Sequence, residues 1–69
     1  MNSNIMAQVH PADIDLLTRL IEAFDHLGIV STLDRSEGLV VIRGTEDTVA
    51  DLAEILNNLP FPLTILPQE

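Results

Sequence analysis

The hydrophobic pattern of the chain changes period several times, and the order of these changes most constrains its fold. Apolar and polar residues alternate over residues 5–9, which is the pattern of a strand with one buried face. Over residues 11–27 the apolar residues recur at intervals of three and four, which indicates an amphipathic helix. The change falls at Pro11, because proline disfavours helical backbone in the residue before it but suits the first turn of a helix. Gly28 then follows as a helix terminator that can adopt positive φ.

The rest of the chain repeats this alternation of patterns. Residues 29–33 and 39–43 are rich in β-branched side chains, and the loop between them ends in Gly38, so they predict an antiparallel hairpin with a left-handed glycine. Thr45 offers an N-cap oxygen for a second amphipathic helix, which we expect to end near two consecutive asparagines. Prolines then prevent the helix from continuing, and residues 63–66 predict a last short strand.

The segments therefore follow the order strand, helix, strand, strand, helix, strand. A chain of 69 residues has room for a single domain, spanning residues 1–69. This order is that of the split β-α-β arrangement, or ferredoxin-like fold. Right-handed crossovers place both helices on one face of a four-stranded antiparallel sheet. The sequence thus predicts an α+β domain whose sheet has a second face that nothing in the chain covers.

The run Leu39-Val40-Val41-Ile42 makes this uncovered face informative. Alternation along a strand puts two of the four aliphatic side chains on each face, whichever phase the strand adopts. If the apolar residues of the first strand face the helices, Met6 joins the uncovered face. Aliphatic side chains on both faces are typical of a strand that is buried on both sides.

A second copy of the chain is the partner that we expect on this face. A core built from 69 residues without a disulfide or a metal is marginal, so a homodimer would hide the face and add stability. The candidate interface residues are Met6, Leu39, Val40, Val41 and Ile42, with the phase of each strand left open. The alternative is a monomer whose surface carries ordinary scattered aliphatic residues.

Composition excludes several classes of function. Eleven acidic residues against three arginines give a formal charge of −8, the wrong sign for binding nucleic acid or an anionic membrane. The chain has no cysteine, which excludes disulfides, thiolate zinc sites, iron–sulfur clusters and thiol catalysis. A hydrophobic content of 46% nevertheless predicts a folded domain. No apolar run reaches the roughly 18 residues of a membrane span and no signal-peptide pattern is present, so we expect a cytoplasmic protein.

His10, Pro11, Ala12 and Asp13 form a candidate ligand site where the first strand meets the first helix. The free amides at a helix N-terminus can bind an anionic group, and His10 and Asp13 converge there. The competing interpretation is that Pro11 and Asp13 only start the helix. His26, expected to complement the helix C-terminus, lies about 24 Å away along the helix at 1.5 Å per residue, so the two histidines cannot share a metal.

No constellation of residues predicts catalysis. The serines and histidines lack the spacing of a nucleophile motif, and the three glycines are isolated instead of forming a phosphate loop. The acidic residues after Pro11 lack the glycine of a calcium loop. With two phenylalanines and no tyrosine or tryptophan, stacking on RNA bases is also disfavoured. We therefore expect no enzymatic activity, no cofactor and no metal.

Residues 20–30, Leu-Ile-Glu-Ala-Phe-Asp-His-Leu-Gly-Ile-Val, followed by the hairpin and the second helix, resemble an ACT-type regulatory domain over nearly the whole chain. The chain is also similar to small stand-alone bacterial ferredoxin-like proteins of unknown function. The ACT resemblance implies that Gly28 is a structural glycine. It also implies that a small ligand, often an amino acid, binds near the first strand–helix loop at a dimer interface. In that loop the family usually has aspartate, any residue, proline and glycine, of which residues 9–12 keep only Pro11.

Two interpretations of the function follow. The first is a non-enzymatic regulatory or adaptor domain that associates with itself through the open face of its sheet. The alternative is a sensor that binds an amino acid or another small carboxylate at His10, Pro11, Ala12 and Asp13. A further protein partner is compatible with either.

Overall fold

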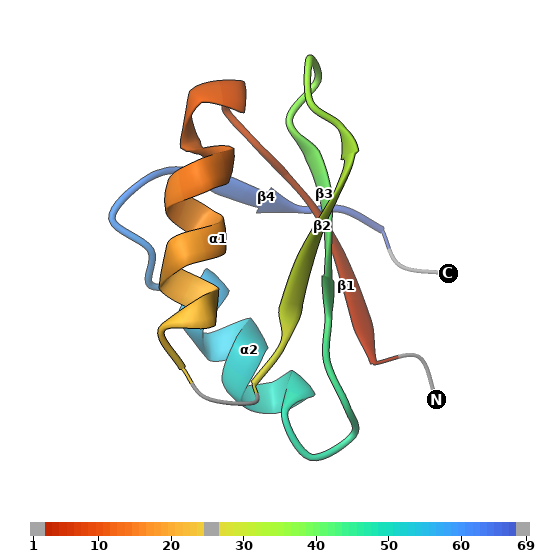
Figure 1. The fold of residues 1–69 in the computed structure, drawn as a ribbon. Helices are drawn as coiled ribbons and strands as arrows, with labels where there is room; N and C mark the ends of the chain where they lie inside the picture. The colour runs from red at the N-terminus through yellow and green to blue at the C-terminus, as the bar shows by residue number, and fades with distance from the viewer. Residues whose placement is uncertain (1–2, 25–26, 68–69) are drawn as a thin grey trace.

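The computed structural model describes residues 3–24 and 27–67 (Figure 1). Its elements are β1 (Asn4–Val9), the 3₁₀ turn η1 (Pro11–Asp13), α1 (Ile14–Glu22), β2 (Ile29–Asp34), β3 (Leu39–Arg43), α2 (Val49–Leu56) and β4 (Leu63–Ile65). Within the described residues the strands form one four-stranded antiparallel sheet in the order β2-β3-β1-β4. The predicted α+β fold with the ferredoxin-like order of elements is confirmed.

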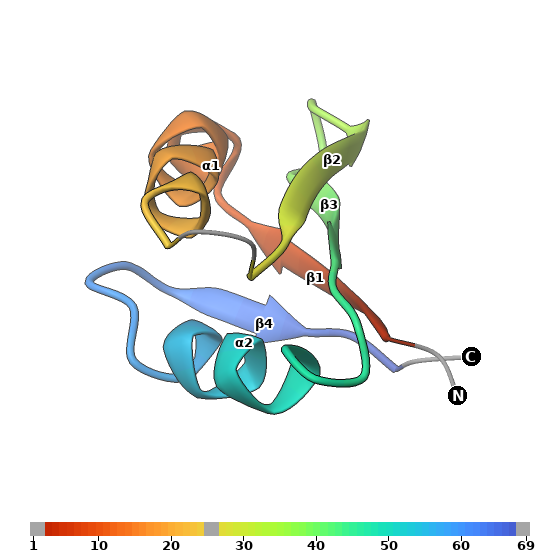
Figure 2. The same ribbon diagram turned by 60° about the horizontal axis from the view of Figure 1, so that its bottom comes forward.

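Both helices pack on one face of the sheet, and they lie on the same side of β2 and β3 in Figures 1 and 2. Along β1 every second side chain is buried, as the alternating pattern predicts. The buried side chains of the strands therefore pack against the apolar stripes of the helices and form a single core between the sheet and the helices. The core consists of Ile5, Ala7, Val9, Val40 and Ile42 from the sheet and of Ile14, Leu17, Ile21, Leu52 and Leu56 from the helices.

The turn between β2 and β3 is held against the end of β1. Asp34 Oδ1 accepts hydrogen bonds from the Ser36 hydroxyl at 2.8 Å and from the amides of Ser36 and Glu37 at 3.1 and 3.3 Å. Gly38 has a φ of 71°, as predicted, and its carbonyl accepts a hydrogen bond from the Val9 amide at 2.9 Å. A Cβ at this position would lie 1.7 Å from the Val9 carbonyl oxygen. Glycine is therefore required both by the backbone conformation and by the close approach of the two strands.

Gly28 is needed for a different reason from the one predicted. It does not adopt a left-handed conformation, so the expected positive φ is wrong. Instead, a Cβ at Gly28 would lie 2.8 Å from the Arg43 carbonyl oxygen and 3.1 Å from Leu52 Cδ1. The glycine lets the start of β2 pack closely against β3 and α2.

The first helix starts at the predicted proline but is shorter than its pattern suggests. Pro11–Asp13 forms a 3₁₀ turn, and the α-helix itself covers Ile14–Glu22 with Ala23 as its C-cap. The last part of the predicted helix contains residues 25–26, which lie outside the described residues, as does the role expected for His26.

The second helix ends where it is predicted to end but begins later. The Thr45 amide donates to Thr48 Oγ1 at 2.8 Å, and the Val49 amide donates to the Thr45 carbonyl at 2.9 Å. Residues 45–48 thus form a preceding turn, with Thr48 as the N-cap of α2. The prediction of Thr45 as the N-cap is wrong because its side chain joins Thr48 within this turn, at 3.3 Å between the two hydroxyl oxygens.

Candidate functional site

The sheet face opposite the helices, here called the open face, is the candidate functional site, and the strand register defines its residues. Residues paired across neighbouring strands lie on the same face of a sheet. Since the buried side chains of β1 point toward the helices, the residues between them point to the open face. Three rows of the open face cross the strands: Ile29, Arg43 and Asn4; Ser31, Val41 and Met6; Asp34, Leu39, Gln8 and Thr64.

The aliphatic run of β3 divides between the two faces of the sheet. Val40 and Ile42 are fully buried in the core under the helices, so they leave the set of candidate interface residues. Leu39 and Val41 lie on the open face together with Met6. Val41 exposes 6% of its surface although no described helix covers it. The apolar middle of the open face is therefore made by three of the five predicted residues.

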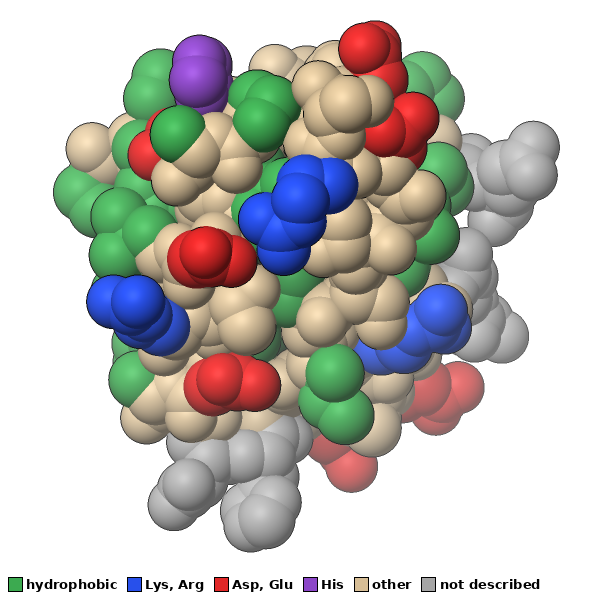
Figure 3. Space-filling view, turned by 45° about the horizontal axis from the view of Figure 1, so that its top comes forward, with side chains coloured by type: hydrophobic (Ala, Val, Ile, Leu, Met, Phe, Trp, Pro, Cys, Tyr) green, Lys and Arg blue, Asp and Glu red, His purple; other side chains and the backbone are tan. Residues whose placement is uncertain are grey.

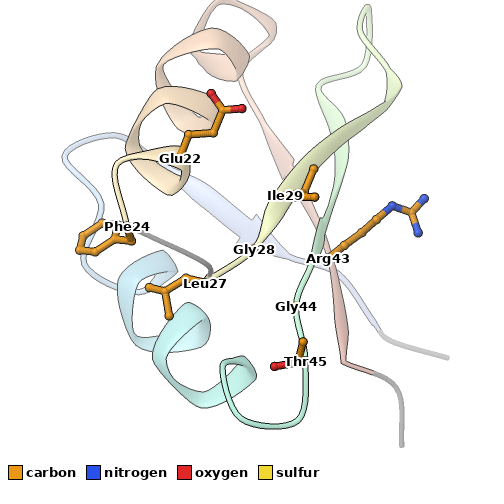
Figure 4. Close-up of a pocket in the computed structure, with 8 residues that line it drawn as sticks. All are labelled: Glu22, Phe24, Leu27, Gly28, Ile29, Arg43, Gly44 and Thr45. Atoms are coloured by element: carbon orange, nitrogen blue, oxygen red, sulfur yellow. The ribbon is translucent and has the colours of Figure 1, made fainter.

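Arg43 lies at one end of the open face. Its Nε donates a hydrogen bond to Ser31 Oγ at 3.1 Å, and its side chain points away from both helices (Figure 4). The ion pair found among the described residues joins Arg35 and Asp15 at 3.6 Å, and Arg43 pairs with none of the described carboxylates. The open face thus ends in an exposed cation.

The opposite end of the open face is acidic. Asp34 lies in the same row as Leu39, and Glu37 follows in the turn, where its carbonyl accepts a hydrogen bond from Gln8 Nε2 at 2.9 Å. The hydrogen bond from the Ser36 hydroxyl, followed by those from the amides of Glu37 and Ser36, lowers the pKa of Asp34 below its usual 3.8 and outweighs the opposing desolvation. Asp34 is therefore anionic at neutral pH.

A cation, an aliphatic middle and an acidic end thus follow one another along the open face. In the part of the chain that the structure describes, no three His, Cys, Asp or Glu side chains are grouped so that they could hold a metal ion. None of the helices in residues 3–24 and 27–67 has the length and hydropathy needed to cross a membrane.

The structure brings together the four residues predicted as a ligand site at the strand–helix junction, but their amides are already engaged. His10 Nδ1 accepts a hydrogen bond from the Ala12 amide at 3.2 Å, and the Asp13 amide donates to the His10 carbonyl at 2.8 Å. The Ile14 amide donates to the Pro11 carbonyl. The amides that were expected to bind an anion therefore donate within the turn, and His10 caps it. Ligand binding at this junction stays a prediction.

A pocket that the sequence analysis missed lies at the other end of α1. It has a volume of about 550 Å³, is open to solvent, and is lined among others by Phe24, Leu27, Ile29 and Thr45 (Figure 4). Phe24 and Ile29 are 45% and 64% exposed. In the sequence, Phe24 and Leu27 belong to the apolar stripe predicted for the first helix and Ile29 to the predicted second strand, so no separate signal marks the pocket.

The acidic side chains of the molecule are dispersed over its surface. Figure 3 shows acidic side chains scattered singly or in small groups, while hydrophobic side chains gather along the left edge of the view, on the side of α1. Exposed carboxylates lie on both helices, for example Asp15 and Glu22 on α1 and Asp51 and Glu54 on α2. Dispersed carboxylates of this kind favour hydration and do not form a cation-binding patch.

Residues 7–62 of the chain match a protein family that is described as a domain of unknown function, DUF4911. The chain belongs to this family. Comparisons of this DUF4911 chain with curated proteins and with solved structures give no match.

The DUF4911 match runs from within β1 to the segment before β4. It therefore includes both helices, the β2–β3 hairpin and both charged ends of the open face. The predicted similarity to a small domain of unknown function is confirmed, whereas the more specific resemblance to ACT-type domains stays a prediction.

Proposed function

We propose that this DUF4911 protein is a small non-catalytic regulatory or adaptor domain that associates with itself through the open face of its sheet. One observation carries the proposal: Met6, Leu39 and Val41 lie together on a sheet face that no described helix covers. Sheets are ordinarily covered on their apolar face by another layer of structure. A second copy supplies that layer and produces a dimer with the two sheets inside and the helices outside.

The size of the open face sets the strength of the association. Four strands about 4.8 Å apart and about five residues long present a surface of roughly 19 by 17 Å. Two such faces bury roughly 650 Å² in total, which is below the roughly 1,200 Å² of standard specific interfaces, so we expect a weak dimer that dissociates in the micromolar range.

The net charge of −8 on each copy opposes association but does not dominate it. The carboxylates of both helices lie on the far side of the sheet from the open face. At ordinary salt, charges separated by more than about 8 to 10 Å are largely screened. The apolar contact at the centre of the interface is not screened in this way.

Sedimentation equilibrium from about 5 to about 500 µM tests the proposal, because this range brackets micromolar dissociation. We expect the wild-type mass to rise from that of a monomer to that of a dimer. Met6→Asp places a charge in the apolar middle of the open face and should keep the protein monomeric throughout. A wild-type protein that remains a monomer at the highest concentration contradicts the proposal.

Leu16→Asp is the matched control, because Leu16 is also a partly exposed apolar residue, 41% exposed, but lies on α1 away from the open face. It should dimerise like the wild type. Circular dichroism of both variants checks that each is folded. Ile42→Asp is unsuitable as a test, since Ile42 is fully buried in the core and the charge would unfold the domain.

A further inference from the structure

The charges at the two ends of the open face determine how the two copies are oriented. We infer that they are related by a two-fold axis that lies between the sheets and runs across the strands, so that Arg43 of each copy pairs with Asp34 and Glu37 of the other. The inference rests on the proposed function, since it specifies the geometry of the same dimer.

The three rows of the open face provide the geometric basis. The Cα atoms of Arg43 and Asp34 lie in the two outer rows, on either side of the row that contains Val41, and the Arg43 side chain leans toward Ser31 of the central row. Two residues along a strand rise by about 6.8 Å, so the outer rows are about 14 Å apart and the central row lies midway. An axis across the strands at the level of Val41 exchanges the outer rows. The Arg43 row of one copy then lies over the Asp34 row of the second copy.

The charges favour this orientation because the cation at one end of the face can pair with the acidic groups at the other end. Arg43 is held at the surface by Ser31 and pairs with none of the described carboxylates. The three hydrogen bonds that Asp34 accepts from described residues all go to Oδ1, so Oδ2 takes part in none of these. Glu37 is exposed beside it. Each dimer would contain this complementary contact twice.

The other two-fold arrangement buries the same aliphatic residues but brings together like charges. An axis parallel to the strands keeps each row over the same row of the second copy. The two Arg43 guanidinium groups then lie at the same end of the interface, and the two acidic turns lie at the other. Since both arrangements pack the same apolar centre, electrostatic complementarity decides between them.

Charge reversal tests the orientation, and the readout is the dimer dissociation constant at low salt. Arg43→Glu places an acid over the acidic turn of the second copy, and Glu37→Arg places a cation over Arg43. Each variant alone should dissociate about tenfold more readily, since two surface contacts per dimer become repulsive. The double variant R43E/E37R should recover most of the wild-type affinity. At about 0.5 M salt the differences should shrink.

An equimolar mixture of the two single variants gives an independent readout. In the inferred geometry a dimer of one R43E chain and one E37R chain has an acid opposite a cation at both contacts. The mixture should therefore associate more strongly than either variant alone. Arg19→Glu on α1 and Glu54→Arg on α2 are matched controls, because they change the net charge equally on exposed helix positions and should leave association unchanged.

The outcomes separate this inference from the proposed function. If the wild type dimerises but R43E and E37R associate as strongly as it does, the orientation is wrong and the dimer stands. The axis parallel to the strands is then supported if R43E mixed with wild type associates more strongly than either protein alone. If the wild type is a monomer at all concentrations, both proposals fail.

Discussion

Gly38 connects the hairpin turn to the first strand, and no other residue can occupy its position without rearrangement. Its φ of 71° is unfavourable for residues with a Cβ, and a Cβ would collide with the Val9 carbonyl oxygen. We expect Gly38→Ala to lower the free energy of unfolding by about 2 to 4 kcal/mol. Urea unfolding followed by circular dichroism measures the change.

Glu37→Ala is the control for this prediction. Glu37 is the exposed neighbour of Gly38 in the same turn, and the bonds found there involve its backbone. At protein concentrations that keep the protein monomeric, its truncation should change the free energy of unfolding by less than about 0.5 kcal/mol. Equal effects of the two substitutions would show that the close contact with Val9 is unimportant.

Asp34 makes the stability of the turn dependent on pH. The Ser36 hydroxyl, then the amides of Glu37 and Ser36, lower the pKa of Asp34 in the folded state below its usual 3.8. A carboxyl group with a lowered pKa stabilises the folded state above its unfolded pKa, and this contribution is lost as the pH falls through the folded pKa. Wild type should therefore be more stable than Asp34→Asn at neutral pH.

The difference between wild type and Asp34→Asn should disappear as the pH is lowered below about 4. Urea unfolding at a series of pH values from about 7 to about 2 measures it. Ser36→Ala removes the largest cause of the pKa shift, so it should reduce the same pH dependence. A difference that grows on acidification would contradict this assignment.

At the scale of elements, β3 contributes side chains both to the core and to the open face. Its four aliphatic side chains alternate between the core and the open face. Ile42→Ala removes a fully buried side chain and should lower the free energy of unfolding by about 2 to 5 kcal/mol. Leu39→Ala removes a partly exposed one and should cost the monomer about 1 kcal/mol or less. Urea unfolding at low protein concentration compares them, and equal losses would contradict the assigned phase of β3.

The kinds of elements and their order could be predicted from the sequence because they depend on local periodicity. All four strands lie within a residue of their predicted bounds, and α2 ends at the predicted place. The start of α2 could not be predicted, because Thr45 and Thr48 are both good caps and the hydrogen bonds of the turn select the second. The reason why position 28 needs a glycine also could not be predicted from the sequence, since the Arg43 carbonyl that Gly28 approaches is distant along the chain.

At the scale of the whole molecule, self-association predicts a stability that depends on protein concentration. Because the folded protein is expected to be mostly monomer at about 5 µM and mostly dimer at about 500 µM, association stabilises each chain by about 1 kcal/mol at the higher concentration. For a domain of this size the Tm should therefore rise by roughly 5 to 10 °C between about 5 and about 500 µM. Differential scanning calorimetry of wild type and Met6→Asp makes the comparison. The Tm of the monomeric variant should not depend on protein concentration. A wild-type Tm that also stays constant would contradict dimerisation.

The candidate site was predictable only in part. The aliphatic run of β3 is visible in the sequence, and so is the consequence that one sheet face carries apolar residues without a covering layer. The position of Arg43 at one end of that face, and of Asp34 at the other, follows from the pairing of β2 with β3 and of β3 with β1. Neither residue was singled out from the sequence, because a lone arginine and a turn aspartate are ordinary features of any chain.

The sequence by itself determined the βαββαβ order, the left-handed glycine of the hairpin and the presence of aliphatic residues on both faces of β3. These features depend on the identity of neighbouring residues and on the fixed periods of helix and strand. Only the tertiary structure decided which aliphatic residues lie in the core, that the amides of the first turn are engaged, and that a cation and an acidic turn end the same face. These depend on register and on contacts between segments far apart in the chain, where a shift of one residue would reverse every side chain.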